Sequence, residues 1–193
     1  LTGSEPLEFS AEPAAVSGSA AENAGYEYNG TRDLAVKRSF EAGGQERRVV
    51  ATNYIADYTK RMDLGPLGEA EVGVFNVVTT PAVGIAGQTL NPIGRYSDAR
   101  LVEFVQQQYS GLGDIERVDS RNITVRGTET TVTKFSATAS IEGQEIDVFV
   151  HVTKYRDGDD FVVAVGVYPQ QLADQEESNV LSMMRAIDHP VEA

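Results

Sequence analysis

The sequence predicts an α+β fold: a mostly antiparallel β-sheet flanked by helices on both faces, as in an α/β/α sandwich. Residues 122–169 contain three runs rich in Val, Ile, Thr and aromatic residues, separated by Gly-bearing turns, which is typical of an antiparallel meander. Two runs, 71–79 and 161–168, are apolar on both faces, so we expect central strands that are covered on both sides. Three helical segments, placed before, between and after these strands, can supply that cover.

The first half of the chain begins with an extended lead-in over residues 1–12. Residues 13–24 are Ala-rich and predict a helix, with Pro13 at its first position and Gly25 as its C-terminal stop. Residues 34–42 and 46–58 predict a hairpin. Residues 81–96 are rich in Gly and Pro and predict a connection, with a short strand near 83–85.

The second half contains two further helices. Residues 97–108 have Ser97 as a cap, and Leu101, Phe104 and Val105 follow helical spacing. Residues 174–187 predict the last helix. Its first turn has the spacing of a capping box, with Asp174 in place of Ser or Thr and Glu177 three residues later. We expect all of residues 1–193 to form one domain.

Composition restricts the possible partners. The chain has a net charge of −13, so we expect it to repel nucleic acid and anionic lipid. Its basic residues include only four Lys among sixteen Lys and Arg, and an acidic, Lys-poor chain is typical of proteins that work in concentrated salt. An acidic protein of an ordinary habitat is the alternative. The absence of Cys excludes disulfides, thiolate nucleophiles and thiolate metal sites.

The two histidines are the first candidates for chemistry. His151 lies on the mixed face of the 145–155 strand, with Phe149 and Tyr155, where a catalytic base or an ordinary half-exposed histidine would fit. No G-x-S-x-G or S-x-x-K motif accompanies it, and two distant histidines cannot supply the usual nitrogen ligands of zinc. We therefore expect no catalytic residue, no cofactor and no metal site. The face carrying Phe149, His151 and Tyr155 becomes the candidate binding surface, with residues 81–96 as a candidate cleft.

Other polar features have structural explanations. The cluster Asp157-Gly158-Asp159-Asp160 could suggest calcium, but it lacks EF-hand spacing and lies between two strong strands, so it predicts a turn. His189 follows the last helix, where its charge suits the helix dipole. Asn29 and Asn122 each begin an N-x-T triplet and are candidate glycosylation sites.

Several segments together resemble an uncharacterised family of haloarchaeal lipoproteins. They are TGSEPLEFSAEPAAVS, LGPLGEAEVGVFNVVTTP, TLNPIG and the long run from VRGTETTV to VVAVGVYP. The resemblance implies a secreted protein, held on the outer side of the cell membrane by a lipid on a cysteine that precedes residue 1. The order of helices and strands is also similar to that of the Mog1/PsbP-like sandwich, whose known members are mainly binding or assembly modules.

Three functions remain open. The favoured one is a non-catalytic, membrane-tethered binding or accessory domain at the surface of a halophile, with a protein or small-molecule partner. The first alternative is a lipoprotein that binds a small molecule or lipid in an apolar cavity of roughly 300 Å³ or more. The second is a hydrolase that uses Asp or Glu with His151, which requires carboxylates that converge in a cleft.

Overall fold

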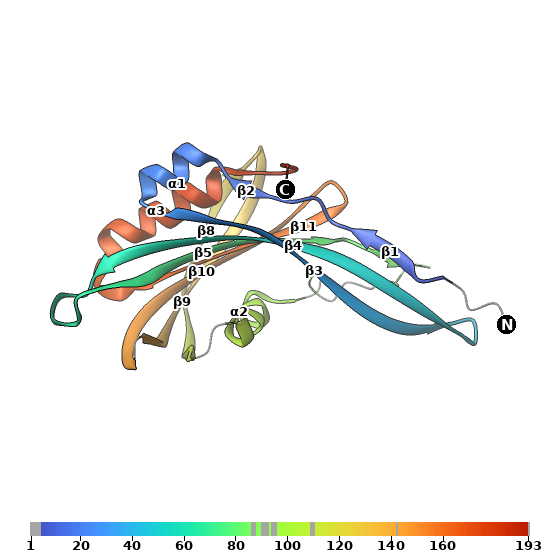
Figure 1. Ribbon diagram of the computed structural model, residues 1–193, viewed down its shortest axis with the longest axis horizontal. Coiled ribbons are helices and arrows are strands. Elements are labelled where there is room, and N and C mark those ends of the chain that lie inside the picture. Colours follow the sequence, from blue (N-terminus) through green and yellow to red (C-terminus); the bar gives the residue numbers. More distant parts are fainter. Residues whose placement is uncertain are drawn as a thin grey trace.

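A computed structural model of the chain describes residues 5–85, 88–89, 93, 96–108, 111–141 and 143–192. Its main sheet has eight strands in the order β1-β4-β5-β11-β10-β9-β8, with β3 paired to β4, and only the β1–β4 pairing is parallel (Figure 1). The strands of this sheet are β1 (Leu7–Ser10), β3 (Glu27–Ala42), β4 (Gln45–Asp63), β5 (Glu69–Pro81), β8 (Gly113–Val125), β9 (Thr128–Ile141), β10 (Gln144–Asp157) and β11 (Asp160–Pro169). The predicted antiparallel meander is therefore confirmed.

Short elements complete the chain. Two small strand pairs are formed by β2 (Ala15–Val16) with β12 (Ile187–Asp188), and by β6 (Gly84–Ile85) with β7 (Gln88–Thr89). The helices are α1 (Gly18–Ala24), α2 (Asp98–Gln108) and α3 (Ala173–Arg185), with single 3-10 turns η1 (Gly65–Leu67) and η3 (Gln170–Leu172).

Strand β4 is long enough to serve three neighbours. It pairs with β3 along residues 45–59, so the two strands that meet its other edge must share it. β1 pairs with residues 49–52 of β4, and β5 with residues 54–63. The outer part of the β3–β4 hairpin, together with β1, consequently projects from the body of the molecule as an arm (Figure 1).

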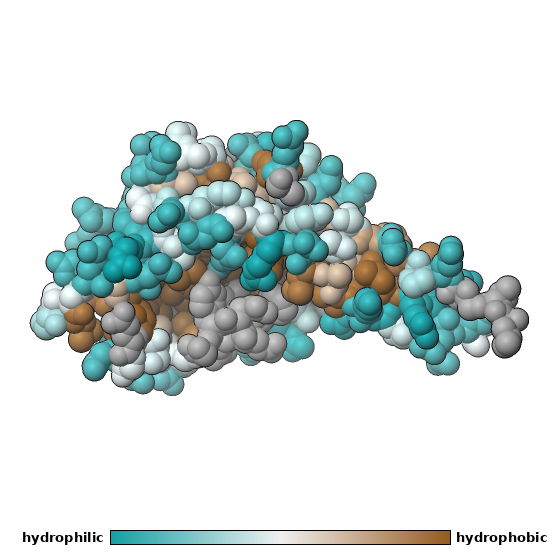
Figure 2. Space-filling model, in the orientation of Figure 1, coloured by the Kyte–Doolittle hydropathy of each residue, from teal (hydrophilic) through white to brown (hydrophobic). Residues whose placement is uncertain are grey.

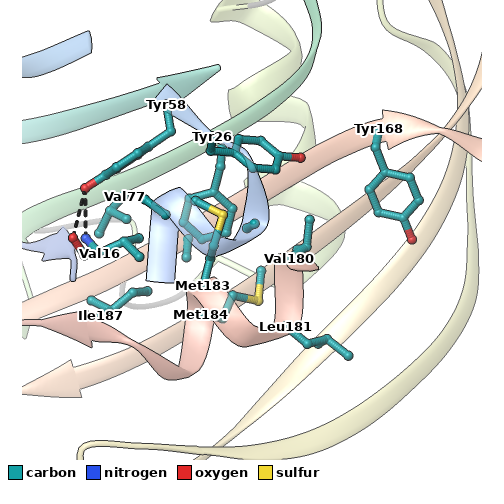
Figure 3. Packing of buried hydrophobic residues seen from close by; sticks show 14 of the residues in the cluster. Val16, Tyr26, Tyr58, Val77, Tyr168, Val180, Leu181, Met183, Met184 and Ile187 are labelled. Carbon is teal, nitrogen blue, oxygen red and sulfur yellow. Dashed lines mark hydrogen bonds between the residues drawn. The ribbon is translucent and has the colours of Figure 1, made fainter. Parts of the chain in front are cut away.

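The two-residue period of the strands divides the core into two layers. In β10, Val148, Val150 and Val152 pack on one face, with Leu101 and Val102 of α2. The other face carries Tyr155 and Tyr168, which belong to the core under α1 and α3. Figure 3 shows α3 side chains such as Val180, Met183 and Met184 directed into this second core. The alternation in 145–155 predicted from the sequence is thus confirmed.

The helical cover is thinner than the sequence predicts. α1 and α3 contact each other and lie over one face, whereas α2 packs against β10 on the other. Neither set extends over the arm (Figure 1). The mostly antiparallel sheet is as expected, whereas a sandwich with helices flanking both faces is not confirmed, because the helices cover only part of each face.

Two helix starts also differ from the prediction. Residues 15–16 are extended because they pair with β12, so α1 begins only at Gly18, although Gly25 ends it as expected, with φ +78°. Figure 3 shows the bonds that fix this segment: Val16 N–H donates to the Tyr58 hydroxyl at 2.9 Å, and that hydroxyl donates to Val16 O at 3.3 Å. The cap position of α3 is Leu172 with no side-chain bond, so the predicted capping box is wrong.

Strand β8 is the element that the sequence did not predict, since only its end at 122–125 falls inside the expected meander. Its residues 113–121 are mostly charged or small, and the two aliphatic ones, Ile115 and Val118, are three residues apart and so do not share a face of the strand. It lies at the edge of the sheet, where exposed charges oppose pairing with other chains. The predicted hairpin turn and the α2 helix are confirmed: Gly43 and Gly44 both have positive φ, and Ser97 Oγ accepts the Arg100 N–H at 3.3 Å.

Candidate ligand groove

A groove of about 480 Å³ lies on the face of the sheet that also carries α2. Five strands contribute to it: β4, β5, β9, β10 and β11. Its apolar walls include Val74, Leu112, Ala139, Ile141, Val148 and Val167. Val74 and Val167 are direct cross-strand neighbours, so their side chains point to the same face.

One end of the groove is polar. Asp57 and Asn76 are cross-strand neighbours in β4 and β5, and Asn76 Nδ2 donates to Asp57 Oδ1 at 2.5 Å. The other carboxylate oxygen of Asp57 lies 3.2 Å from Arg32 Nε. Asp57 and Asn76, together with Thr59, Glu71 and Ser140, thus add polar groups to a mainly apolar lining, an arrangement that can orient a ligand.

The loop after α2 forms part of the wall. Gly111 lies against β9, where Ser140 N–H donates to Gly111 O at 3.2 Å. A Cβ on Gly111 would lie 2.9 Å from Ser140 Cβ, and the residue has φ +96°, so the position requires glycine. This close approach places Leu112, which is 7% exposed, among the groove residues.

The three predicted binding residues lie on the opposite face and do not form a surface. His151 and Tyr155 are 1% and 6% exposed, and Phe149 is half-buried against the α3 side of the core. The expectation of an exposed aromatic surface for a partner is therefore wrong. The reason is that this mixed face is covered by α3, with which it shares a hydrophobic core.

His151 itself is part of a buried contact. Its Nε2 lies 2.8 Å from the Tyr168 hydroxyl, and the two rings stack with centroids 5.4 Å apart. Burial lowers the pKa of His151 to about 4, with Glu177 opposing and Lys134 and Arg121 adding to the shift. The ring is therefore neutral near pH 7, where it can accept a bond from the Tyr168 O–H.

The recess beside His151 is small. It measures about 10 Å³ and includes Asp119, Lys134 and Glu177 among its lining residues. Such a space admits one water molecule and no substrate. Three of its charged residues are already engaged, because Glu177 pairs with Lys134 and with Arg121, each at 3.2 Å. A polar groove of about 440 Å³ adjoins it along α3, lined by both signs of charge, including Arg121, Asp174 and Arg185.

A second buried polar cluster escaped sequence reasoning. His189 is 4% exposed, and its Nδ1 and Nε2 lie 3.2 Å from Asp157 and 3.0 Å from Asp160. Only a ring that carries both protons can donate to both carboxylates. Asp160 also accepts the Glu12 N–H at 2.8 Å, so the cluster connects the β10–β11 turn with both ends of the chain. Residues 157–160 do form the predicted turn.

The remaining candidates are surface features. Asn29 and Asn122 are both exposed and lie in the outer strands β3 and β8, and their glycosylation stays a prediction. Much of the candidate cleft at 81–96 falls outside the described residues. Of its described part, Val83 and Ile93 are buried. Within the part of the chain that the structure covers, no three His, Asp or Glu residues are grouped as a metal site would require.

The groove residues could not be chosen from the sequence, with one exception. Asn76 is the single polar residue inside the apolar run V-G-V-F-N-V-V, and that interruption marks a polar position on a strand otherwise predicted as core. The apolar walls look like any other core positions. Their selection depends on which part of the face α2 leaves open.

The chain belongs to the family defined by the domain of unknown function DUF6517, which matches residues 13–188. No protein of curated function matches it. Among the helices that the structure describes, none has the length and apolar character to cross a membrane.

Three solved structures are similar over most of the chain. Cyanobacterial PsbP (CyanoP) from Synechocystis sp. PCC 6803 is 13% identical, with a TM-score of 0.41, and the match covers 97% of this chain and 98% of that one. PA94, a protein of unknown function from Pseudomonas aeruginosa, is 13% identical with a TM-score of 0.40, covering 81% and 99%. LpqN of Mycobacterium tuberculosis, involved in cell envelope biogenesis, is 9% identical with a TM-score of 0.36, covering 82% and 91%. Likeness at this level carries no functional argument.

Proposed function

We propose that this chain is a non-catalytic binding domain that holds a small, mostly apolar molecule in the groove on the sheet face that also carries α2. The groove itself is the observation that carries the proposal. Its volume of about 480 Å³ lies in the range of roughly 300–1,000 Å³ that is usual for small-molecule sites. The groove thus supports the first alternative from the sequence, a protein that binds a small molecule or lipid in an apolar cavity.

The chemistry of the lining supports an apolar ligand with one polar end. Valine and leucine side chains that face a hollow gain about 25 cal/mol for each Å² that a ligand removes from water. The Asp57 carboxylate in the lining can accept a hydrogen bond from a hydroxyl or amide of the ligand, because each of its oxygens can accept more than one bond. A medium-chain alcohol, acid or lipid fragment fits this distribution.

The proposal favours binding over hydrolysis. His151 lies on the other face of the sheet from the groove, and the recess beside it has room for one water molecule only. We place the domain at the outer surface of a cell in high salt, tethered by a lipid. This placement is supported by the resemblance of the sequence segments to haloarchaeal lipoproteins and by the net charge of −13.

The test is binding of N-phenyl-1-naphthylamine, a neutral probe whose fluorescence rises in apolar sites, followed by competition with fatty acids and alcohols of graded length. Ala139→Trp fills the groove, because Ala139 lies in its wall. Ala35→Trp is the matched control, since Ala35 is an exposed strand residue of β3 far from the groove.

We expect saturable probe binding to the wild type and to Ala35→Trp, and at least about a tenfold loss in Ala139→Trp, equivalent to about 1.4 kcal/mol. Thermal melts of all three proteins verify that each is folded. Probe binding that is absent from the wild type, or that Ala139→Trp leaves unchanged, contradicts the proposal.

A further inference from the structure

The arm has two faces of different chemistry. It consists of β1 with residues 32–42 of β3 and 45–55 of β4. Because side chains alternate along a strand, the pairing register decides which residues share a face. We name the arm face the side that carries Leu7, Phe9, Leu34, Val36, Phe40 and Ala51.

These apolar residues are accessible. Leu7 is 39% exposed and Leu34 is 37% exposed, while Phe9, Val36 and Phe40 are half-buried. Figure 2 shows apolar side chains gathered on the arm between hydrophilic ones. No helix that the structure describes covers this part of the sheet (Figure 1).

The carboxylates of the arm lie on one face only, whereas its basic residues lie on both, with Lys37 and Arg48 on the carboxylate face. Arg32, Arg38 and Arg47 share the arm face, at positions that alternate with its apolar residues. Within the described chain, neither Arg38 nor Arg47 has a carboxylate within salt-bridge distance, whereas Arg32 pairs with Asp57 at 3.2 Å. The carboxylates of the paired arm residues all point to the opposite side. They belong to Glu8, Asp33, Glu41 and Glu46.

We propose that the arm face docks on an anionic lipid surface. Aliphatic and Phe side chains, flanked by arginines whose long stems can lie along the apolar part, are what an interfacial element presents to the boundary between headgroups and acyl chains. An anionic headgroup supplies the negative partner that Arg38 and Arg47 do not have within the described chain. A protein partner is less well matched, since of the three usual hot-spot residue types the arm face has Arg but neither Trp nor Tyr.

The net charge of −13 does not oppose this docking. From Tyr28 to the turn at Gly43, β3 extends for about 50 Å at ~3.3 Å per residue. The Debye length is about 8 Å at physiological salt and about 3 Å at 1 M salt, so at either salt concentration the acidic body is screened from a surface that the arm touches. The acidic face of the arm itself lies on the far side of the sheet and favours this one orientation.

The test is flotation with vesicles of phosphatidylglycerol or of phosphatidylcholine, using the full chain and two double variants. Arg38→Glu/Arg47→Glu reverses the charge at two positions of the arm face. Lys37→Glu/Arg48→Glu makes the same change in net charge at neighbouring residues of the opposite face, and is the matched control. A Leu34→Ser variant tests the apolar contribution, and circular dichroism melts confirm that all variants fold.

We expect binding to phosphatidylglycerol vesicles that weakens as salt is raised. Arg38→Glu/Arg47→Glu should lose at least about tenfold in the partition coefficient, and Lys37→Glu/Arg48→Glu less than about threefold. Absence of vesicle binding, equal losses in both double variants, or equal binding to phosphatidylcholine overturns the proposal. Two further results would overturn it: dimerisation through the arm, or binding to poly-glutamate without binding to vesicles. The outcome is independent of the groove, because the fluorescent probe is tested without vesicles.

Discussion

Gly166 of β11 lies where α3 crosses the sheet. A Cβ at this position would lie 2.6 Å from Val180 Cγ1 and 3.3 Å from Phe75 Cδ2. Both neighbours belong to the same core, so neither can move without disturbing its packing. The glycine thus determines how closely the helix approaches the strand.

Gly166→Ala should lower the free energy of unfolding by about 1–3 kcal/mol, because a buried methyl forces α3 outward. Urea denaturation measures the change. Gly18→Ala serves as the control, since nothing lies within 4 Å of a Cβ there, and it should stay within about 0.5 kcal/mol of the wild type. Equal stabilities of the two variants would show that α3 does not pack this closely.

His151 should make stability depend on pH. Its pKa is about 4 in the folded protein and 6.5 when exposed, so the unfolded chain binds the proton more readily. Above pH 6.5 the ring is neutral in both the folded and the unfolded chain, so its burial does not require the loss of a proton. As the pH falls from 6.5 to 4, about 3 kcal/mol of stability is lost.

His151→Gln removes the titrating ring and keeps a group that can bond to the Tyr168 hydroxyl. Unfolding free energies of the wild type and of this variant, measured from pH 7 to pH 4, should therefore converge or cross as the pH falls. Curves that remain parallel over this range would mean that the ring is reached by water in the folded state.

At the scale of elements, an ion pair with a buried carboxylate and a partly buried ammonium connects both helices of one face to the sheet. Lys60 Nζ of β4 lies 2.6 Å from Glu176 Oε1 of α3 and donates to Ala24 O, at the end of α1, at 2.9 Å. Tyr26 donates to the second carboxylate oxygen at 3.2 Å. Burial and the neighbouring Glu176 both raise the pKa of Tyr26, so its hydroxyl remains a donor.

Glu176→Ala should cost about 3 kcal/mol, because it leaves a largely buried ammonium without its partner. Glu69→Ala breaks an exposed pair with Arg61 at 3.5 Å and should cost less than about 0.5 kcal/mol. Lys60→Met/Glu176→Leu should recover part of the loss. Thermal denaturation compares them, and a double variant that is less stable than Glu176→Ala would contradict this account of the pair.

Sequence reasoning succeeded where one element carries its own pattern. Alternating valines in β10 and the fully apolar run of β11 predict a covered central sheet, because each strand records the burial of its two faces. It failed at β8, whose edge position requires charges in place of an apolar face. It also placed the start of the first helix too early, since the pairing of Val16 with Ile187 is formed by residues that are distant in the sequence.

The candidate site was harder to predict than the fold, because its residues too are distant from one another in the sequence. Asp57, Leu112 and Val167 come from three separated segments, and only the fold brings them to one groove. The net charge also gives no information on how charge is distributed, because it averages over faces that the pairing register separates. Arg38 and Glu41 are three residues apart and lie on opposite sides of the arm.

At the scale of the whole molecule, the two faces of the long sheet differ. The face under α1 and α3 is closed by side chains and holds the buried polar contacts of His151 and Glu176. The face that carries α2 remains open at the groove, and its register continues outward into the arm face. Stability is concentrated on the first face, and we place ligand binding on the second.

A methyl NMR titration with a medium-chain fatty acid tests the central claim most directly. The account predicts saturable shifts of the methyl groups of Val74, Val148 and Val167, which line the groove, with Val162 and Val180 on the other face unchanged. Shifts centred on Val162 and Val180, or no saturable shift at any valine, would contradict it.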